Sequence, residues 1–172
     1  MALPGALSAQ GGVTSMAHLL REVGIDFVGR APVRHVFARE ISASPETVYR
    51  ALAEDVPGWP DWFSAVTLAR PLDDGARREV RLKGGTRFEE TILAAKSPEV
   101  YAYRVDLTNA PGARAMVEEW RLAPAGTGTR VQWTFAVDGT APFRFAFGLA
   151  KPGLGRTFRS AVGALDRRLS LR

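Results

Sequence analysis

The chain has 172 residues, of which 46% are hydrophobic and 24% charged, values typical of a globular protein with one sizeable core. It contains no cysteine, which excludes disulfides, thiol catalysis and cysteine metal sites. With only His18 and His35, a three-histidine zinc centre is excluded and a Ser-His-Asp triad has two candidate histidines. The composition therefore disfavours metal-dependent and nucleophilic hydrolysis, and we predict no cofactor.

The formal net charge of +5 is concentrated at the end of the chain. Residues 141–172 carry seven Arg and Lys against one Asp, a net +6, which leaves residues 1–140 at −1. Such a segment is either a patch for an anionic membrane or nucleic acid, or a solvated helix face whose cations favour the helix dipole. Because no aromatic residues interleave with these arginines as on a nucleic-acid platform, we predict no nucleic-acid partner.

The first 14 residues are small and rich in Gly and Ala, without the basic start or the long apolar run of a signal peptide. No stretch approaches the 18 apolar residues typical of a membrane span. We therefore expect a cytoplasmic protein in which residues 1–30 form a partly flexible tail with a short helix near residues 17–23. Met1 and Met16 both remain open as the natural start.

A strand-like run over residues 33–41 begins the ordered part. Ser44 then supplies a helix N-cap and Pro45 suits the first helical position, so a helix is predicted from Pro45 to about Glu54. The prolines that follow at 57 and 60 end this helix and leave room for one further short turn.

The middle of the chain predicts strands separated by short turns, and its end predicts one long helix. Because the turns are short, neighbouring strands are expected to be antiparallel. Apolar residues at steps of three and four after Lys151-Pro152-Gly153 mark a helix that runs to about Leu169. The six predicted strands are residues 66–70, 77–82, 86–95, 100–107, 114–122 and 129–137.

These elements predict an α+β domain over residues 31–172. A seven-stranded antiparallel sheet with one apolar face needs a cover, and only the C-terminal helix is long enough to supply it. A strongly twisted sheet curls around a single helix, which rarely fills the concave side. We therefore expect a cavity between sheet and helix that can hold a ligand.

Three local motifs carry a resemblance to a known family. They are Ile41-Ser42-Ala43-Ser44-Pro45-Glu46-Thr47-Val48-Tyr49, Trp59-Pro60-Asp61-Trp62 and Gly128-Thr129-Arg130-Val131-Gln132-Trp133. With the terminal amphipathic helix, they resemble the polyketide cyclase/dehydrase branch of the START-like (SRPBCC) superfamily over residues 33–170. The resemblance implies a helix-grip fold. It does not distinguish an enzyme from a ligand carrier, because the superfamily includes polyketide cyclases, lipid and sterol carriers and hormone binders.

Strand alternation predicts which side chains face the cavity. The inward set is apolar and aromatic, and we add Trp62 from the helix junction and Phe158 from the final helix. The predicted ligand-binding residues are Phe37, Arg39, Trp62, Phe88, Tyr101, Trp120, Trp133 and Phe158.

The same alternation places three polar residues, Glu90, Tyr103 and Glu118, inside and makes them the catalytic candidates. A buried carboxylate is costly unless it is paired, and its pKa shifts, so Arg39 is the natural partner for either glutamate. A glutamate with a raised pKa, or the phenol of Tyr103, suits enolisation, aldol closure or dehydration of a poly-β-ketone. The alternative is a structural ion pair, or a bulge that turns a carboxylate outward.

The predicted function is binding of a hydrophobic small molecule, aromatic, polyketide-like or lipid, by a monomer or homodimer, with cyclisation or dehydration by acid/base chemistry. The alternative is a lipid carrier or interaction module without catalysis, whose basic C-terminal helix makes peripheral membrane contact. His35 is either a proton shuttle or a hydrogen-bonded edge residue. No metal site is predicted, because Asp73 and Asp74 lie in a turn without partners at fixed spacing.

Overall fold

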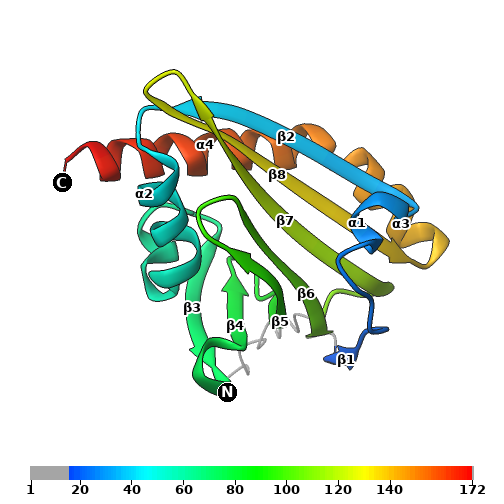
Figure 1. Cartoon of the computed structure of the whole chain (residues 1–172). Helices are drawn as coiled ribbons and strands as arrows, with labels where there is room; N and C mark the ends of the chain where they lie inside the picture. The colour runs from blue at the N-terminus through cyan, green and yellow to red at the C-terminus, as the bar shows by residue number, and fades with distance from the viewer. Residues whose placement is uncertain (1–15, 172) are drawn as a thin grey trace, which may run out of the picture.

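The computed structural model describes residues 16–171, and within them an antiparallel sheet is the main element (Figure 1). The strands are hydrogen-bonded in the order β2-β8-β7-β6-β5-β4-β3, and β1 pairs with β6. Their bounds are β1 His18–Leu19, β2 Val33–Ile41, β3 Val66–Leu72, β4 Arg77–Leu82, β5 Arg87–Lys96, β6 Val100–Thr108, β7 Ala113–Ala125 and β8 Gly128–Gly139. The predicted α+β fold, with its seven-stranded sheet and long final helix, is confirmed.

The helices connect and cover this sheet. Their bounds are α1 Phe27–Arg30, α2 Pro45–Tyr49, the π-helical turn η1 Arg50–Glu54, the 3-10 helices η2 Val56–Asp61 and η3 Asp73–Gly75, α3 Ala141–Leu149 and α4 Lys151–Ser170. As predicted, the Ser44 side chain caps α2 by accepting a hydrogen bond from the backbone nitrogen of Thr47. No helix in the described part of the chain is long and apolar enough to cross a membrane.

The first and last long strands are neighbours, and α4 covers the concave face that they share with β7 (Figure 1). In the register of β2 with β8, Phe37 lies opposite Trp133. From α4, the ring of Phe158 packs on Trp133 with centroids 6.1 Å apart, on Trp120 at 6.2 Å and on Phe37 at 5.9 Å. At this point aromatic rings fill the space between helix and sheet.

The N-terminal residues differ from the prediction. The helix expected near residues 17–23 is wrong, because His18 and Leu19 pair as a strand with Thr108 and Leu107. The reason lies in β6, whose pairing with β7 ends at Arg104 and leaves the next backbone groups free. The chain then continues into α1, whose Phe27 packs on the outer face of β7 and β8. The rest of the predicted tail, residues 1–15, lies outside the described residues.

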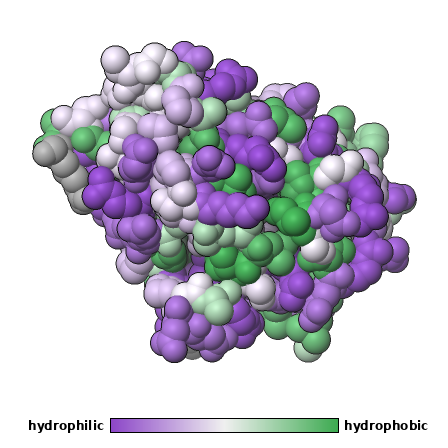
Figure 2. All heavy atoms as spheres, in the orientation of Figure 1, coloured by the Kyte–Doolittle hydropathy of each residue, from purple (hydrophilic) through white to green (hydrophobic). Residues whose placement is uncertain are grey.

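Helix α3 was not predicted. Thr140 caps it by accepting a hydrogen bond from the Phe143 backbone nitrogen, and Pro142 lies in its first turn. None of its residues is buried, and two large apolar side chains on it, Phe145 and Leu149, are 70% and 67% exposed. On the face seen in Figure 2, hydrophilic side chains cover most of the surface around a hydrophobic central area.

Gly128 provides a test of how tightly the start of β8 packs on the end of β2. A Cβ atom at this position would overlap the backbone carbonyl oxygen of Ile41, which cannot move without breaking strand pairing. We expect Gly128→Ala to lower the free energy of unfolding by about 1–3 kcal/mol in chemical denaturation. Gly148→Ala is the control, because its Cβ meets no atom within 4 Å in α3, and it should be neutral or slightly stabilising. Equal stability of the two variants would contradict the close contact.

Candidate functional site

A buried polar cluster crosses four adjacent strands of the concave face. Arg78 on β4 lies directly opposite Glu90 on β5, and Tyr103 on β6 lies directly opposite Glu118 on β7. All four are buried, with exposed fractions of 2%, 1%, 1% and 7%. The register of the sheet therefore brings one cation, two carboxyl groups and a phenol together in an apolar interior.

Arg78 is held by an ion pair and by two aromatic faces. Its Nε donates to Oε2 of Glu90, and its guanidinium carbon lies 3.7 Å from the ring centroid of Tyr103 and 4.3 Å from that of Trp59. Burial alone would lower the pKa of Arg78, but Glu90 and the neighbouring tyrosines raise it above its ordinary value. Arg78 therefore stays charged, while its Nη1 has no hydrogen-bond partner among residues 16–171.

Glu118 ends a short hydrogen-bonded chain. Its Oε2 accepts from the Tyr103 hydroxyl and from Trp133 Nε1, both at 2.8 Å, and the Tyr103 hydroxyl accepts from Trp120 Nε1 at 3.0 Å. Burial and the charge of Glu90 raise the pKa of Glu118 to about 7, against the opposing effects of Tyr103, Arg78 and Trp133. No donor to Oε1 is found within the described part of the chain. Glu118 therefore has one oxygen held by two donors, one oxygen without a donor among residues 16–171, and a pKa near neutral.

The phenol and the second carboxylate are less suited to proton transfer. Burial and the neighbouring Glu118 raise the pKa of Tyr103 well above its ordinary value, and its hydroxyl is committed to Glu118. Burial raises the pKa of Glu90, which the adjacent Arg78 opposes. Of the three predicted catalytic residues, Glu118 is thus the one with a pKa near neutral and an oxygen without a donor in the described residues, and the catalytic role of all three stays a prediction.

Arg39 does not join the cluster. As strand alternation predicts, Arg39 faces α4. It lies on the edge strand β2, however, where it is exposed, and its Nη1 donates to the backbone carbonyl of Arg159 at 2.7 Å. The predicted pairing of Arg39 with a glutamate is therefore wrong, and Arg78 takes that place. The alternation in β4 contained the signal, because Arg78 shares its face with Val80 and Leu82.

The other predicted ligand-binding residues are mostly core aromatics around this cluster. Trp120 and Trp133 stack with centroids 5.5 Å apart, and Trp62 lies 5.0 Å from Trp59. Tyr101 and Phe158 are also buried, as is Phe88, while Phe37 is half-buried against α4. Their contact with a ligand stays a prediction.

One pocket reaches the polar cluster. It has a volume of about 360 Å³, lies between the α2–η1 segment and strands β4 to β6, and includes Arg78, Tyr101, Tyr49 and Ile92 in its lining. The predicted cavity between sheet and α4 stays a prediction. Among residues 16–171, no group of three or more His, Asp or Glu side chains is placed to hold a metal ion.

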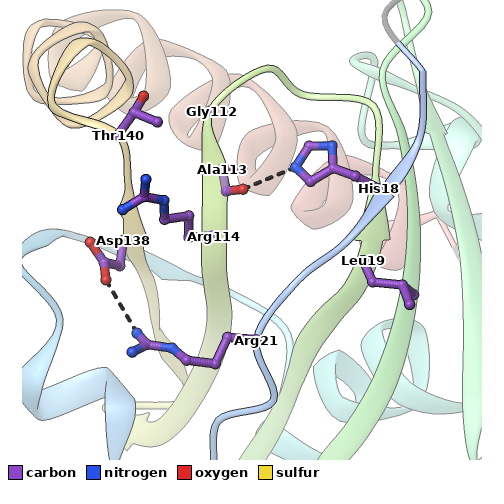
Figure 3. Close-up of a pocket in the computed structure, with 8 residues that line it drawn as sticks. All are labelled: His18, Leu19, Arg21, Gly112, Ala113, Arg114, Asp138 and Thr140. Atoms are coloured by element: carbon purple, nitrogen blue, oxygen red, sulfur yellow. Dashed lines mark hydrogen bonds and ion pairs between the residues drawn. The ribbon is translucent and has the colours of Figure 1, made fainter.

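A second pocket, of about 450 Å³, lies away from the cluster between β1, β7 and β8 (Figure 3). Arg21 reaches across it to Asp138 at 3.2 Å, and His18 Nε2 lies 3.0 Å from the backbone carbonyl oxygen of Ala113. Arg21 and His18 thus bond within the wall of this pocket. The other histidine, His35, is buried, and its Nε2 lies 2.9 Å from the carbonyl oxygen of Phe147. This contact favours the hydrogen-bonded role of His35 over that of a proton shuttle.

The antiparallel sheet wrapped around a long C-terminal helix is a START-like, helix-grip fold. Residues 33–170 match the family described as polyketide cyclase/dehydrase and lipid transport, and the chain belongs to this family. An uncharacterized protein of Mycobacterium tuberculosis is 26% identical over 150 residues, covering 84% of this chain and 89% of that protein.

Solved structures show the same fold. A START superfamily protein from Mycobacterium smegmatis matches with a TM-score of 0.65 and 16% identity, covering 80% of this chain and 97% of that one. The protein XoxI from Bacillus cereus also has a TM-score of 0.65 and 16% identity, covering 80% of this chain and 95% of its own. Family and fold are consistent with binding of a hydrophobic ligand.

The raised pKa of Glu118 predicts a pH-dependent stability. The folded state keeps the Glu118 proton up to about pH 7, whereas an unfolded chain releases it near 4.5. Because the folded state then binds more protons, the free energy of unfolding should fall as pH rises between these values and level off above them. Relative to wild type, Glu118→Gln should gain about 2–3 kcal/mol between pH 5 and pH 8 in urea denaturation. The control is Glu99→Gln, at an exposed position, whose free energy of unfolding should change with pH as that of wild type does. If the free energy of unfolding of Glu118→Gln also followed wild type, Glu118 would not be a buried titrating carboxyl group.

Proposed function

We propose that this domain binds a hydrophobic, polyketide-like molecule and that Glu118 acts on it as a general acid/base. The observation that carries the proposal is a buried carboxyl group with a pKa of about 7, one oxygen of which is held by Tyr103 and Trp133. A group with a pKa near the working pH is both an adequate base and an adequate acid. The family description, polyketide cyclase/dehydrase and lipid transport, supports this substrate class.

The proposed reaction is ring closure of a poly-β-ketone. Oε1 of ionised Glu118 removes a proton from a carbon between two carbonyl groups, and the electron pair of that C–H bond forms an enolate. The enolate carbon attacks a second carbonyl carbon, forming the C–C bond and leaving an alkoxide. The Glu118 proton passes to this alkoxide, so the step consumes no net proton. Tyr103 is a positioning residue, because its hydroxyl holds Oε2 and does not need to touch the substrate.

The pH profile of turnover tests this assignment. With a linear poly-β-ketoacyl thioester, wild-type kcat should fall as pH drops below about 7, when Glu118 becomes protonated and ceases to be a base. Glu118→Gln should reduce kcat at least 100-fold, the lower end of the usual general-base contribution. Tyr103→Phe removes a hydrogen bond that lowers the pKa of Glu118, so the midpoint of the profile should move to higher pH. Unchanged turnover by Glu118→Gln would eliminate the catalytic proposal.

A second candidate function, a lipid carrier that docks on membranes, is favoured by the surface of α3. Phe145 and Leu149 are one helical turn apart and expose 70% and 67% of their surface on the same face. Lys151 and Arg156 follow at the exposed start of α4, in the segment of net charge +6. Apolar side chains flanked by cations suit the interface of an anionic bilayer.

Vesicle binding tests this second candidate. The protein should cosediment with vesicles of phosphatidylglycerol and phosphatidylcholine but not with phosphatidylcholine alone, and less at high salt because ions screen the attraction. Phe145→Ser with Leu149→Ser should weaken binding at least tenfold. Leu19→Ser with Leu171→Ser removes two leucines elsewhere that are more exposed, at 78% and 88%, and should bind as wild type. Two outcomes would reject membrane docking by this surface: binding that is the same for charged and uncharged vesicles, or an α3 variant that binds as tightly as wild type.

A further inference from the structure

The pocket between the α2–η1 segment and strands β4 to β6 ends on a charged group that the proposed chemistry does not use. Of the three charged residues in its lining, Glu54 is exposed, Arg77 is half-buried and Arg78 is only 2% exposed. Tyr49 and Tyr101, both buried, contribute aromatic walls. The pocket therefore combines aromatic and apolar walls with charged groups near its opening and a single deeply buried cation.

One edge of the Arg78 guanidinium lacks a hydrogen-bond partner in the described part of the chain. Glu90 binds its Nε, and Trp59 and Tyr103 lie against its π faces. Its Nη1 is buried and has no hydrogen-bond acceptor anywhere in residues 16–171. Buried donors are paired in nearly all folded proteins, so an unpaired one beside a pocket indicates an acceptor that comes from a ligand.

We propose that this pocket is a second ligand subsite, in which Arg78 donates a hydrogen bond to the carbonyl oxygen of an uncharged hydrophobic molecule. The charges around the pocket favour a ligand with a neutral carbonyl group over one with a carboxylate. Glu90 already neutralises Arg78, so a ligand carboxylate would add an uncompensated negative charge to the interior. Of the other two charged residues in the lining, Arg77 is already paired with Asp73 and Glu89, and the exposed Glu54 repels an anion. A ketone or ester oxygen satisfies Nη1 without adding charge.

The subsite stands apart from the chemistry assigned to Glu118. Arg78 lies on the ring face of Tyr103, whereas Glu118 binds the hydroxyl of the same tyrosine. A molecule in the pocket therefore contacts the cluster through Arg78, with no need for proton transfer by Glu118. Binding of a simple aromatic ketone needs no ring closure and is measured without turnover, so the two proposals can fail separately.

Three naphthalene probes of similar shape test the ligand class by NMR titration of the ¹⁵N-labelled protein. We expect 2-acetylnaphthalene, which has a carbonyl, to bind about tenfold more tightly than 2-ethylnaphthalene, which lacks it, because the hydrogen bond is made to a charged donor. The carboxylate 2-naphthoate should bind more weakly than the ketone. Equal affinity of ketone and ethyl compound, stronger binding of the carboxylate, or no saturable binding of the ketone would each overturn the proposal.

Two matched variants test the location. Ala95 is exposed on β5 and lines the pocket, so Ala95→Trp should weaken ketone binding at least tenfold by filling it. Ala123 is an exposed alanine on β7 outside the lining, and Ala123→Trp should bind as wild type. If Ala95→Trp also binds as wild type, the ketone does not use this pocket and the subsite is wrong. Neither substitution touches the buried cluster, so both should fold.

A double variant tests the donor itself. Arg78→Met with Glu90→Gln removes both charges together and avoids leaving one of them unpaired. Its preference for the ketone over the ethyl compound should fall to about one, with the naphthalene ring still bound. A preference that survives in the folded double variant would show that another group binds the carbonyl. If the double variant does not fold, the comparison of Ala95→Trp with Ala123→Trp still decides.

Discussion

The interior of this domain is organised around the ion pair between Arg78 and Glu90. Removing two charges from water costs several kcal/mol per ion unless close geometry and further contacts offset it. Here the partners lie directly opposite each other on β4 and β5, and two aromatic faces contact the guanidinium. A slip of one residue between these strands would separate the charges and turn one of them outward. The pair therefore fixes the register of the half of the sheet that carries the site.

The acid/base properties of the neighbouring carboxyl group follow from that pair. Glu118 lies in the same interior but has no cation of its own, so burial and the charge of Glu90 raise its pKa, while Tyr103 and Trp133 limit the rise. Two glutamates in one cluster are thus placed in different environments, one beside a guanidinium and one beside two neutral donors. This difference in environment makes Glu90 the counter-ion of Arg78 and Glu118 the group that titrates near neutral pH.

Much of the fold was predictable because it depends on local chemistry. Turn residues set the strand boundaries, and alternation placed Glu90, Tyr103 and Glu118 on the inner face, although β5 contains two register irregularities. Alternation gives the face of a side chain but not its place across the sheet. It therefore predicts Arg39 beside glutamates that lie two strands away, for Glu118, and four strands away, for Glu90. Strand β1 forms because β7 leaves one stretch of β6 unpaired. This depends on the tertiary structure and could not be predicted from the sequence or composition of β1 itself.

The net charge of the chain is a property of its outside. The excess of +6 lies in residues 141–172, the segment that contains α3 and α4. Within the cluster on the concave face, Arg78 is balanced by Glu90, and the other carboxyl group, Glu118, holds its proton up to about neutral pH. A basic protein therefore has a nearly uncharged concave interior. Molecules that enter it are selected by hydrogen-bond acceptors and apolar surface, whereas the cations outside act on whatever surface the protein approaches.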